Sequence, residues 1–294
     1  MKNTIFTGAG VAIVTPMNSD LTVNYDLFGK LIDFQLENGT DAIIVTGTTG
    51  ESSTLSEQEH IECIKFTVDH VNHRVPVIAG TGSNSTETAI MLSKEAEKCG
   101  ADALLVVTPY YNKTSQKGLA LYFTAIADSV DIPVILYNVP SRTGMNIDIA
   151  TYKALQDHPN IVAVKEASGN ISYAAKIAAE TTLDIYSGND DIIVPMMSLG
   201  AKGVISVLSN CLPRVTHEMA QFCLDNDFNS ATKLQLKYLD FINSLFCDVN
   251  PIPVKEALNI MGWNVGECRL PLCKMDDVKI DKLKKSMKNA GIIN

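Results

Sequence analysis

One lysine stands at the end of a run of small and β-branched apolar residues, where its amine could take part in chemistry. The stretch IVAVKEASGN covers residues 161–170, and Lys165 follows four apolar residues typical of a buried strand. A lone lysine usually reaches solvent, and that interpretation is favoured while Lys165 is considered by itself. The alternative is a nucleophilic amine at the mouth of a pocket, where it could attack a carbonyl group.

Four further side chains could complete such a site. Tyr137 ends an apolar run, and its phenol could relay protons to and from a carbinolamine. Arg142 lies in the loop that follows, where its guanidinium could hold a carboxylate by a bidentate pair. Thr48 and Thr49 follow another apolar run and could position the phenol or bind a carboxylate. Each also has an ordinary alternative, as a core tyrosine, a surface arginine or helix-capping threonines.

Metal and nucleotide chemistry find little support in the sequence. The five histidines and seven cysteines form no H-E-x-x-H or C-x-x-C pattern, so we expect no metal site. Gly80 and Gly82 begin a dinucleotide fingerprint, but Ser85 stands where that fingerprint needs a third glycine. Without a metal to polarise a carbonyl, Lys165 remains the candidate that could activate one as a Schiff base.

Eight apolar runs end in Gly-, Thr- or Pro-rich turns and are followed by amphipathic segments. The predicted strands are 10–16, 41–47, 76–82, 101–109, 132–140, 160–168, 183–188 and 203–210. Their apolar residues are consecutive rather than alternating, which suits parallel strands that are covered on both faces. Asn24, Asn170 and Pro213 are well placed to begin helices, and Ser56 with Glu59 fits a capping box.

Eight strand–helix units in order predict an α/β fold, a (β/α)8 TIM barrel with a small C-terminal all-helical domain. We predict the barrel over residues 1–227 and the helical domain over 228–294. Barrel enzymes carry their chemistry at the C-terminal ends of the strands. The residues at or just past these ends include Thr48, Thr49, Tyr110, Tyr111, Tyr137, Arg142, Lys165 and Gly188. We therefore expect them to converge on one pocket.

Charge and hydropathy limit the partners. The formal net charge is -9, and no basic run offers a grip for nucleic acid or an anionic membrane. The N-terminal MKNTIFTGAG lacks the apolar core of a signal peptide, and no apolar run approaches the ~20 residues that span a bilayer. We expect a soluble, cytoplasmic protein.

The sequence closely resembles the dihydrodipicolinate synthases, also called 4-hydroxy-tetrahydrodipicolinate synthases, among the pyruvate-dependent lyases that include N-acetylneuraminate lyase. The stretches that carry the resemblance are GTTGESSTL (47–55), VIAGTGSN (77–84), VTPYYNK (107–113), ILYNVPSRTG (135–144), VAVKEASGN (162–170), GVISV (203–207) and NPIPVKEAL (250–258). The PSRTG loop is the narrowest of these signals, because sialic-acid lyases do not resemble it there.

The resemblance implies an aldol condensation of pyruvate with L-aspartate 4-semialdehyde, by a class I aldolase mechanism, in diaminopimelate and lysine biosynthesis. Lys165 would form a Schiff base with pyruvate, so no external cofactor is expected. Thr48 and Tyr137 would form a proton relay, completed by Tyr111 from a neighbouring subunit. The expected assembly is a homotetramer, built as a dimer of dimers.

The resemblance also implies how the substrates are bound. Thr49 would help bind the pyruvate carboxylate, and Arg142 would bind the carboxylate of the semialdehyde. Gly188 and Ile205 would line the pocket through backbone groups. Desolvation at the barrel mouth would favour the neutral amine that has to attack the ketone.

Lysine-inhibited relatives bind lysine at a second site, of which this sequence keeps only part. The matching positions are Ser52, His60, Asn84 and Tyr110. Glu57 stands in place of a histidine, and Thr88 replaces a glutamate that pairs with the ammonium of lysine. Because a hydrogen bond to a charged group contributes about 1.5–3 kcal/mol, we expect lysine to inhibit weakly or not at all.

Two other functions stay open at this point. The first is a related Schiff-base lyase that acts on a sugar acid or on a keto acid derived from hydroxyproline. Arg142 and the set of Thr48, Tyr111 and Tyr137 argue against it. The second is a non-catalytic member that binds pyruvate-like ligands as a sensor or a structural protein. The presence of Lys165 argues against that function.

Overall fold

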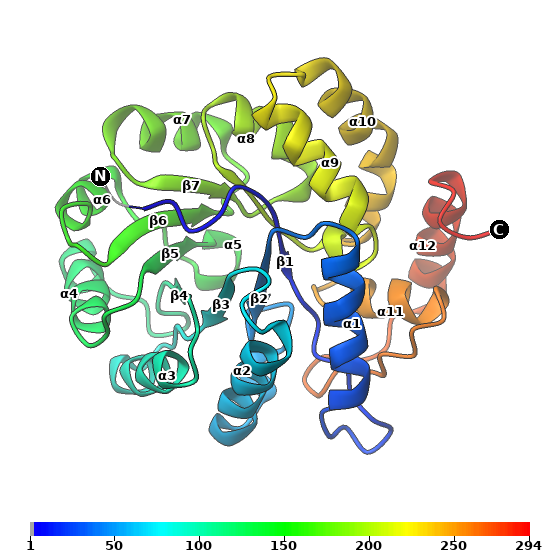
Figure 1. Ribbon diagram of the computed structural model, residues 1–294, viewed down its shortest axis with the longest axis horizontal. Helices are drawn as coiled ribbons and strands as arrows, with labels where there is room; N and C mark the ends of the chain where they lie inside the picture. The colour runs from blue at the N-terminus through cyan, green and yellow to red at the C-terminus, as the bar shows by residue number, and fades with distance from the viewer. Residues whose placement is uncertain (1–2) are drawn as a thin grey trace.

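The computed structural model, which describes residues 3–294, contains a closed barrel of eight parallel strands (Figure 1). The strands are β1 (Gly8–Ala12), β2 (Ala42–Val45), β3 (Val77–Gly80), β4 (Ala103–Val107), β5 (Val134–Asn138), β6 (Ile161–Glu166), β7 (Asp184–Ser187) and β8 (Gly203–Ser206). Each strand pairs with the next along the chain, and β8 closes the barrel by pairing with β1. The predicted TIM barrel is therefore confirmed.

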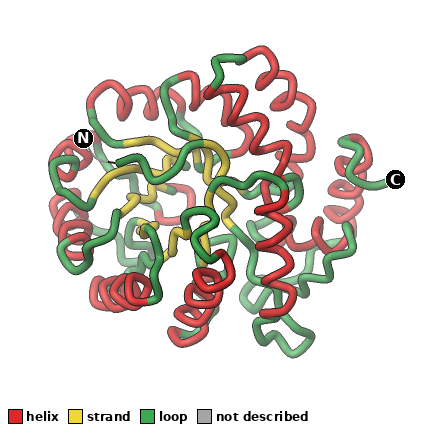
Figure 2. The backbone as a smooth tube through the Cα atoms, viewed as in Figure 1, coloured by secondary structure: helices red, strands yellow, loops and turns green. Residues whose placement is uncertain are grey.

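Helices surround the barrel, as Figure 2 shows by colour. They are α1 (Tyr25–Glu37), α2 (Glu57–Val71), α3 (Thr86–Lys98), α4 (Gln116–Ala127), α5 (Pro140–Thr143), α6 (Ile149–Leu155), α7 (Ile171–Glu180), α8 (Ile193–Ser198) and α9 (Pro213–Leu224). Asn24 and Asn170 accept hydrogen bonds from the helices that they begin. Ser56 and Glu59 form the predicted capping box, and Pro213 occupies the first turn of α9. The predicted helix starts are thus confirmed.

Several strands are shorter than predicted, and the first is displaced. β1 covers residues 8–12 instead of 10–16, and β8 ends at residue 206 instead of 210. Beyond β1, the Val14 N–H turns away from the ladder and donates to Asn210 Oδ1 at 3.0 Å. Val14 is nevertheless fully buried in the apolar core, so the apolar pattern alone does not mark where the ladder ends.

Two apolar cores meet across the barrel wall. One fills the barrel itself, and the other lies between the strands and the surrounding helices. Phe6 closes the N-terminal end of the barrel by stacking on Tyr186, with 4.4 Å between ring centroids, and the Tyr186 hydroxyl donates to the Phe6 carbonyl at 2.8 Å. Only the opposite end, at the C-terminal ends of the strands, is left for a pocket.

The seam between β1 and β8 depends on a glycine. A Cβ atom built on Gly203 would lie 2.0 Å from the backbone oxygen of Gly8. That separation is far inside van der Waals contact with a backbone atom that the strand pairing holds in place. Only glycine therefore lets the two strands approach closely enough to close the barrel.

Three helices follow the barrel: α10 (Phe228–Ser244), α11 (Ile252–Ile260) and α12 (Asp277–Asn289). α10 packs against α8 and α9, and α12 packs against α10 and α11 (Figure 1). The division into domains at residues 227 and 228 stays a prediction, and residues 1 and 2 of the first domain lie outside the described residues. Within residues 3–294, every helix is too short or too polar to cross a membrane.

A buried ion pair ties these C-terminal helices to the loop that follows β2. Lys255 on α11 places its Nζ 2.7 Å from Glu51 Oε1, and the two side chains are 2% and 0% exposed. The same Nζ donates to the backbone oxygens of Thr15 and Glu267 at 3.2 and 2.8 Å. Glu51 Oε2 accepts the Arg269 N–H at 2.9 Å. Lys255 and Glu51 are thereby hydrogen-bonded as well as paired, which buried charges require.

Candidate active site

Lys165 and Tyr137 lie side by side at the C-terminal ends of neighbouring strands. The parallel register pairs Tyr137 of β5 with Lys165 of β6, so the two side chains leave the barrel wall on the same face. Lys165 Nζ lies 4.5 Å from the centroid of the Tyr137 ring. Both residues are buried, at 6% and 7% exposure. An amine and a phenol are thus in mutual contact where a barrel carries its chemistry.

A cavity of about 150 Å³ adjoins Lys165. Its lining includes six of the predicted site residues, which are Thr48, Thr49, Tyr137, Arg142, Lys165 and Gly188. They come from the ends of β2, β5, β6 and β7, as expected for residues that converge at a barrel mouth. The cavity therefore combines an amine, hydroxyl groups and a guanidinium around a space the size of a small organic acid.

Three of the expected residues do not line this cavity, which are Tyr110, Tyr111 and Ile205, and Tyr110 lines a different cavity. Ile205 of β8 is buried within the barrel core. Tyr111 has a positive φ of 71° and leaves 93% of its surface exposed, so it does not reach the cavity of its own chain. Their expected roles stay predictions. Among residues 3–294, no three His, Cys, Asp or Glu side chains gather closely enough to hold a metal ion.

A buried hydrogen-bond network fixes the loop that carries Arg142. Asn138 donates through Nδ2 to Glu166 Oε2 at 2.8 Å and accepts the Ile147 N–H at 3.2 Å. Burial raises the pKa of Glu166, while hydrogen bonds from Ser168 and Asn138 act in the opposite direction. Asn138 is the last residue of β5, and its side chain binds both Glu166 of β6 and Ile147 at the far end of the loop. The two strands therefore set the position of Arg142.

A second buried carboxylate holds the turn after β8. Asp190 Oδ2 accepts the backbone N–H groups of Val207 and Leu208, both at 2.9 Å. Burial raises its pKa, whereas its hydrogen bonds and the positive charge of Lys165 lower it. Sequence reasoning missed Asp190, because its partners lie on a different strand–helix unit.

Asn250 was also missed, although it contacts two predicted site residues. Its Nδ2 donates to Thr49 Oγ1 at 3.0 Å, and its backbone oxygen accepts from Arg142 Nη2 at 3.1 Å. It is 6% exposed and lines the Lys165 cavity. The stretch NPIPVKEAL was a signal, but a search of strand ends alone does not reach the segment before α11.

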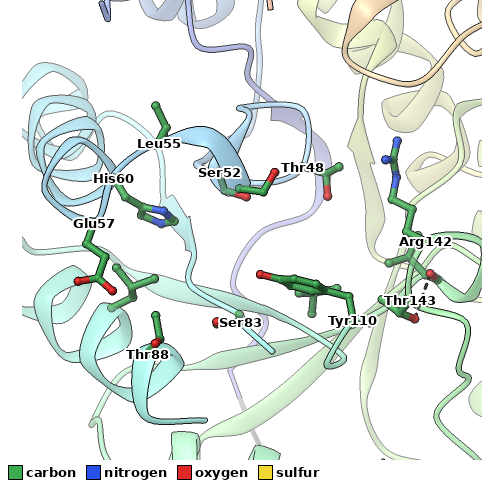
Figure 3. Close-up of a pocket in the computed structure, with 15 residues that line it drawn as sticks. Thr48, Ser52, Leu55, Glu57, His60, Ser83, Thr88, Tyr110, Arg142 and Thr143 are labelled. Atoms are coloured by element: carbon green, nitrogen blue, oxygen red, sulfur yellow. Dashed lines mark hydrogen bonds between the residues drawn. The ribbon is translucent and has the colours of Figure 1, made fainter. Parts of the chain in front are cut away.

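A larger cavity of about 340 Å³ lies beside the first, between the loop after β2 and helices α2 and α3 (Figure 3). Five residues of the expected lysine site line it, which are Ser52, Glu57, His60, Thr88 and Tyr110. Figure 3 shows Tyr110 pointing across the cavity toward the side that carries Glu57, His60 and Thr88. Asn84 is not part of the lining.

The two cavities share Thr48, Val139 and Arg142. Lys165 lines the smaller cavity and not the larger one, so the smaller cavity is the candidate for the chemistry. In the larger cavity, His60 Nε2 contacts the Gly80 carbonyl at 2.8 Å, and burial lowers the pKa of its imidazole. Thr48 therefore lies on the wall between the candidate catalytic cavity and the larger one.

Comparison with known proteins agrees with these observations. A model of the dihydrodipicolinate synthetase family matches residues 5–290. The chain is 60% identical to a 4-hydroxy-tetrahydrodipicolinate synthase of Lachnoclostridium phytofermentans, over 98% of this chain and 99% of the relative. The resemblance inferred from the sequence is thereby confirmed.

Solved structures give the same result. The chloride-inhibited dihydrodipicolinate synthase of Acinetobacter baumannii, complexed with pyruvate, superimposes with a TM-score of 0.96 at 44% identity, covering 99% of this chain and 100% of that one. The enzyme of Cyanidioschyzon merolae with lysine bound gives a TM-score of 0.95 at 41% identity, with coverage of 99% and 100%.

Proposed function

Since the chain belongs to the dihydrodipicolinate synthetase family, whose enzymes are lyases of the class I aldolase type, we propose that it condenses pyruvate with L-aspartate 4-semialdehyde. It would then be a 4-hydroxy-tetrahydrodipicolinate synthase of diaminopimelate and lysine biosynthesis. The observation that carries this proposal is the buried contact between Lys165 Nζ and the Tyr137 ring, inside a cavity that Thr48, Thr49 and Arg142 also line.

The first half-reaction joins pyruvate to the enzyme. Lys165 Nζ attacks the keto carbon, and the carbinolamine loses its oxygen as water to leave an imine. Tyr137 and Thr48 carry the protons that these steps release and consume. Thr49 binds the pyruvate carboxylate. No external cofactor is needed, because the imine itself withdraws the electrons that the next step requires.

The second half-reaction forms the carbon–carbon bond. Loss of a methyl proton from the imine gives an enamine, whose carbon attacks the aldehyde carbon while the aldehyde oxygen takes up a proton. Arg142 holds the carboxylate of the semialdehyde by charge-assisted hydrogen bonds, and backbone groups of Gly188 and Ile205 line the pocket. Hydrolysis of the imine frees Lys165, and the product cyclises.

We also propose that the enzyme works as a cytoplasmic homotetramer, a dimer of dimers. Tyr111 supports this, because an aromatic residue held at 93% exposure and a positive φ is placed to enter another subunit rather than its own cavity. It would complete the proton relay of Thr48 and Tyr137 across the dimer interface.

Weak or absent inhibition by lysine is the further part of the proposal. The larger cavity remains, but Thr88 offers a neutral hydroxyl where an anion would pair with an ammonium group. Glu57 supplies a carboxylate from α2 instead, and Figure 3 shows it on a different helix from Thr88. A titration of free lysine against the steady-state rate tests this, and strong inhibition at modest lysine concentration would refute it.

The decisive experiment couples product formation to the next reductase and follows the consumption of reduced nicotinamide. The wild type is expected to turn over pyruvate with aspartate semialdehyde, and Lys165→Ala is expected to be inactive. Lys202→Ala is a matched control, since this lysine is 41% exposed and lies outside the cavity. Borohydride with pyruvate should add one reduced pyruvate unit to the wild type and none to Lys165→Ala.

The outcomes separate the alternatives. A trapped pyruvate adduct without turnover of the semialdehyde would move the function to another aldehyde acceptor. The absence of any adduct from the folded wild type would contradict Schiff-base chemistry altogether.

A further inference from the structure

Asn250 links the two groups that are proposed to bind the substrate carboxylates. Its side-chain amide donates to the Thr49 hydroxyl at 3.0 Å, while its backbone carbonyl accepts from the Arg142 guanidinium at 3.1 Å. The residue belongs to none of the eight strand–helix units, because it lies between α10 and α11. One buried residue of the segment between two C-terminal helices thus contacts both Thr49 and Arg142 in the lining of the cavity.

The direction of the hydrogen bond at Thr49 has a chemical consequence. A threonine hydroxyl has one proton and can turn it toward whichever acceptor is nearest. When Asn250 Nδ2 donates to Thr49 Oγ1, the oxygen acts as an acceptor there, and its own proton is left for another partner. Thr49 then presents an O–H donor to the cavity, which is the polarity that a carboxylate requires.

The amide is held in place by the packing of α11. This helix begins at Ile252, two residues after Asn250, and Lys255 on its first turns forms the buried pair with Glu51. Glu51 belongs to the same loop as Thr49. Both partners of the Asn250–Thr49 hydrogen bond are therefore carried on segments that a buried ion pair joins.

We propose that Asn250 is a positioning residue for pyruvate, which orients the Thr49 hydroxyl so that its proton faces the substrate carboxylate. This inference rests on the proposed function, because it assigns a partner to the residue that binds pyruvate. The contact to Arg142 uses the backbone oxygen, so a side-chain substitution at Asn250 leaves it in place. Pyruvate binding and semialdehyde binding should therefore respond differently to the same change.

The first test is Asn250→Leu, which keeps the approximate shape and removes the amide. The KM for pyruvate should rise about tenfold or more, as expected for a misdirected hydrogen bond to a charged group. The KM for the semialdehyde should stay within about threefold of the wild-type value, because the backbone contact to Arg142 is kept. Asn259→Leu is the matched control on the adjoining helix α11, because the Asn259 amide donates to the Gly266 carbonyl, outside the cavity.

A double-mutant cycle with Thr49→Val connects the effect to the hydroxyl. In the valine background there is no proton to orient, so Asn250→Leu should no longer change the pyruvate concentration that half-saturates borohydride trapping. If Asn250 had only a structural role, the effects of the two substitutions on the free energy of pyruvate binding would instead add. Such a role also predicts that both KM values and the unfolding midpoint shift together.

Asn250→Asp keeps the test open if the leucine variant does not fold. A carboxylate can only accept, so it would draw the Thr49 proton away from pyruvate and add charge repulsion. The loss in pyruvate affinity should be larger with Thr49 present than in the Thr49→Val background, where repulsion alone remains. An equal or smaller loss with Thr49 present would overturn the inference, as would an unchanged pyruvate KM in Asn250→Leu. A wild type that fails to trap pyruvate would refute the proposed function instead.

Discussion

Removing the amine of Lys255 should destabilise the protein far more than an ordinary lysine substitution. Nζ of Lys255 lies 2.7 Å from Glu51 Oε1, and the two side chains are 2% and 0% exposed. Lys255→Met would leave the Glu51 carboxylate buried without its cationic partner, although the Arg269 backbone N–H would still donate to it. Breaking a buried pair by removing one partner costs about 3–5 kcal/mol, and that is the expected loss in the free energy of unfolding.

The assay is denaturant-induced unfolding at one fixed protein concentration, because assembly of subunits would otherwise shift the midpoint. Lys98→Met is the matched control, since Lys98 pairs with Glu95 at 2.6 Å but is 68% exposed. An exposed pair contributes about 0–1 kcal/mol, so this variant should be nearly as stable as the wild type. The double variant Glu51→Gln with Lys255→Met should recover part of the loss, because it buries no unpaired charge.

If Lys255→Met and Lys98→Met lowered the free energy of unfolding by the same amount to within about 0.5 kcal/mol, burial would not explain the contribution of the Lys255–Glu51 pair. A double variant less stable than Lys255→Met alone would likewise contradict the idea that the unpaired carboxylate causes the loss.

Three other predictions follow from the contacts described. Gly203→Ala should fail to give a soluble, folded barrel, because its Cβ would meet the Gly8 carbonyl at 2.0 Å; a normal circular dichroism spectrum and melting curve would contradict this. Arg269 holds the pKa of Glu59 at about 2, below its ordinary 4.5, so the stabilisation is fully present above about pH 4.5 and is lost as the pH falls toward 2. The stability gap between wild type and Glu59→Gln should therefore close over that range in acid titrations of the unfolding free energy. Arg142→Lys should raise the KM for the semialdehyde about tenfold while borohydride still traps pyruvate, since lysine lacks the bidentate fork; loss of trapping would show that Arg142 serves pyruvate too.

The barrel and the position of its amine could be predicted because both follow from local patterns. Consecutive apolar runs indicate strands covered on both faces, and the strand-end rule then places Lys165 and Tyr137 at the mouth. Their contact follows from the register of two adjacent parallel strands. The helix starts at Asn24 and Ser56 were equally local, since a cap and its partner lie within one turn.

Features that depend on distant partners could not be predicted in this way. Val14 is as apolar as a strand residue, but its N–H pairs with Asn210, and nothing near residue 14 in the sequence indicates that partner. Asn250 meets Thr49 across 201 residues, and Lys255 meets Glu51 across 204. A buried polar side chain carries no periodic signal, so its role becomes visible only when the packed structure supplies its partner.

The seam that closes the barrel also affects how the chain can be synthesised and folded. Asn210 Nδ2 donates to the Ala12 carbonyl across 198 residues, and β1 has no second neighbour until β8 has been made. During translation the growing sheet therefore keeps two open edges, at the first strand and at the newest one, and open edges recruit other strands. About two-thirds of the chain separates Gly8 from its partner Gly203, so these edges stay open for most of synthesis, and closing the ring is a late step that carries the loop-closure entropy of that long separation.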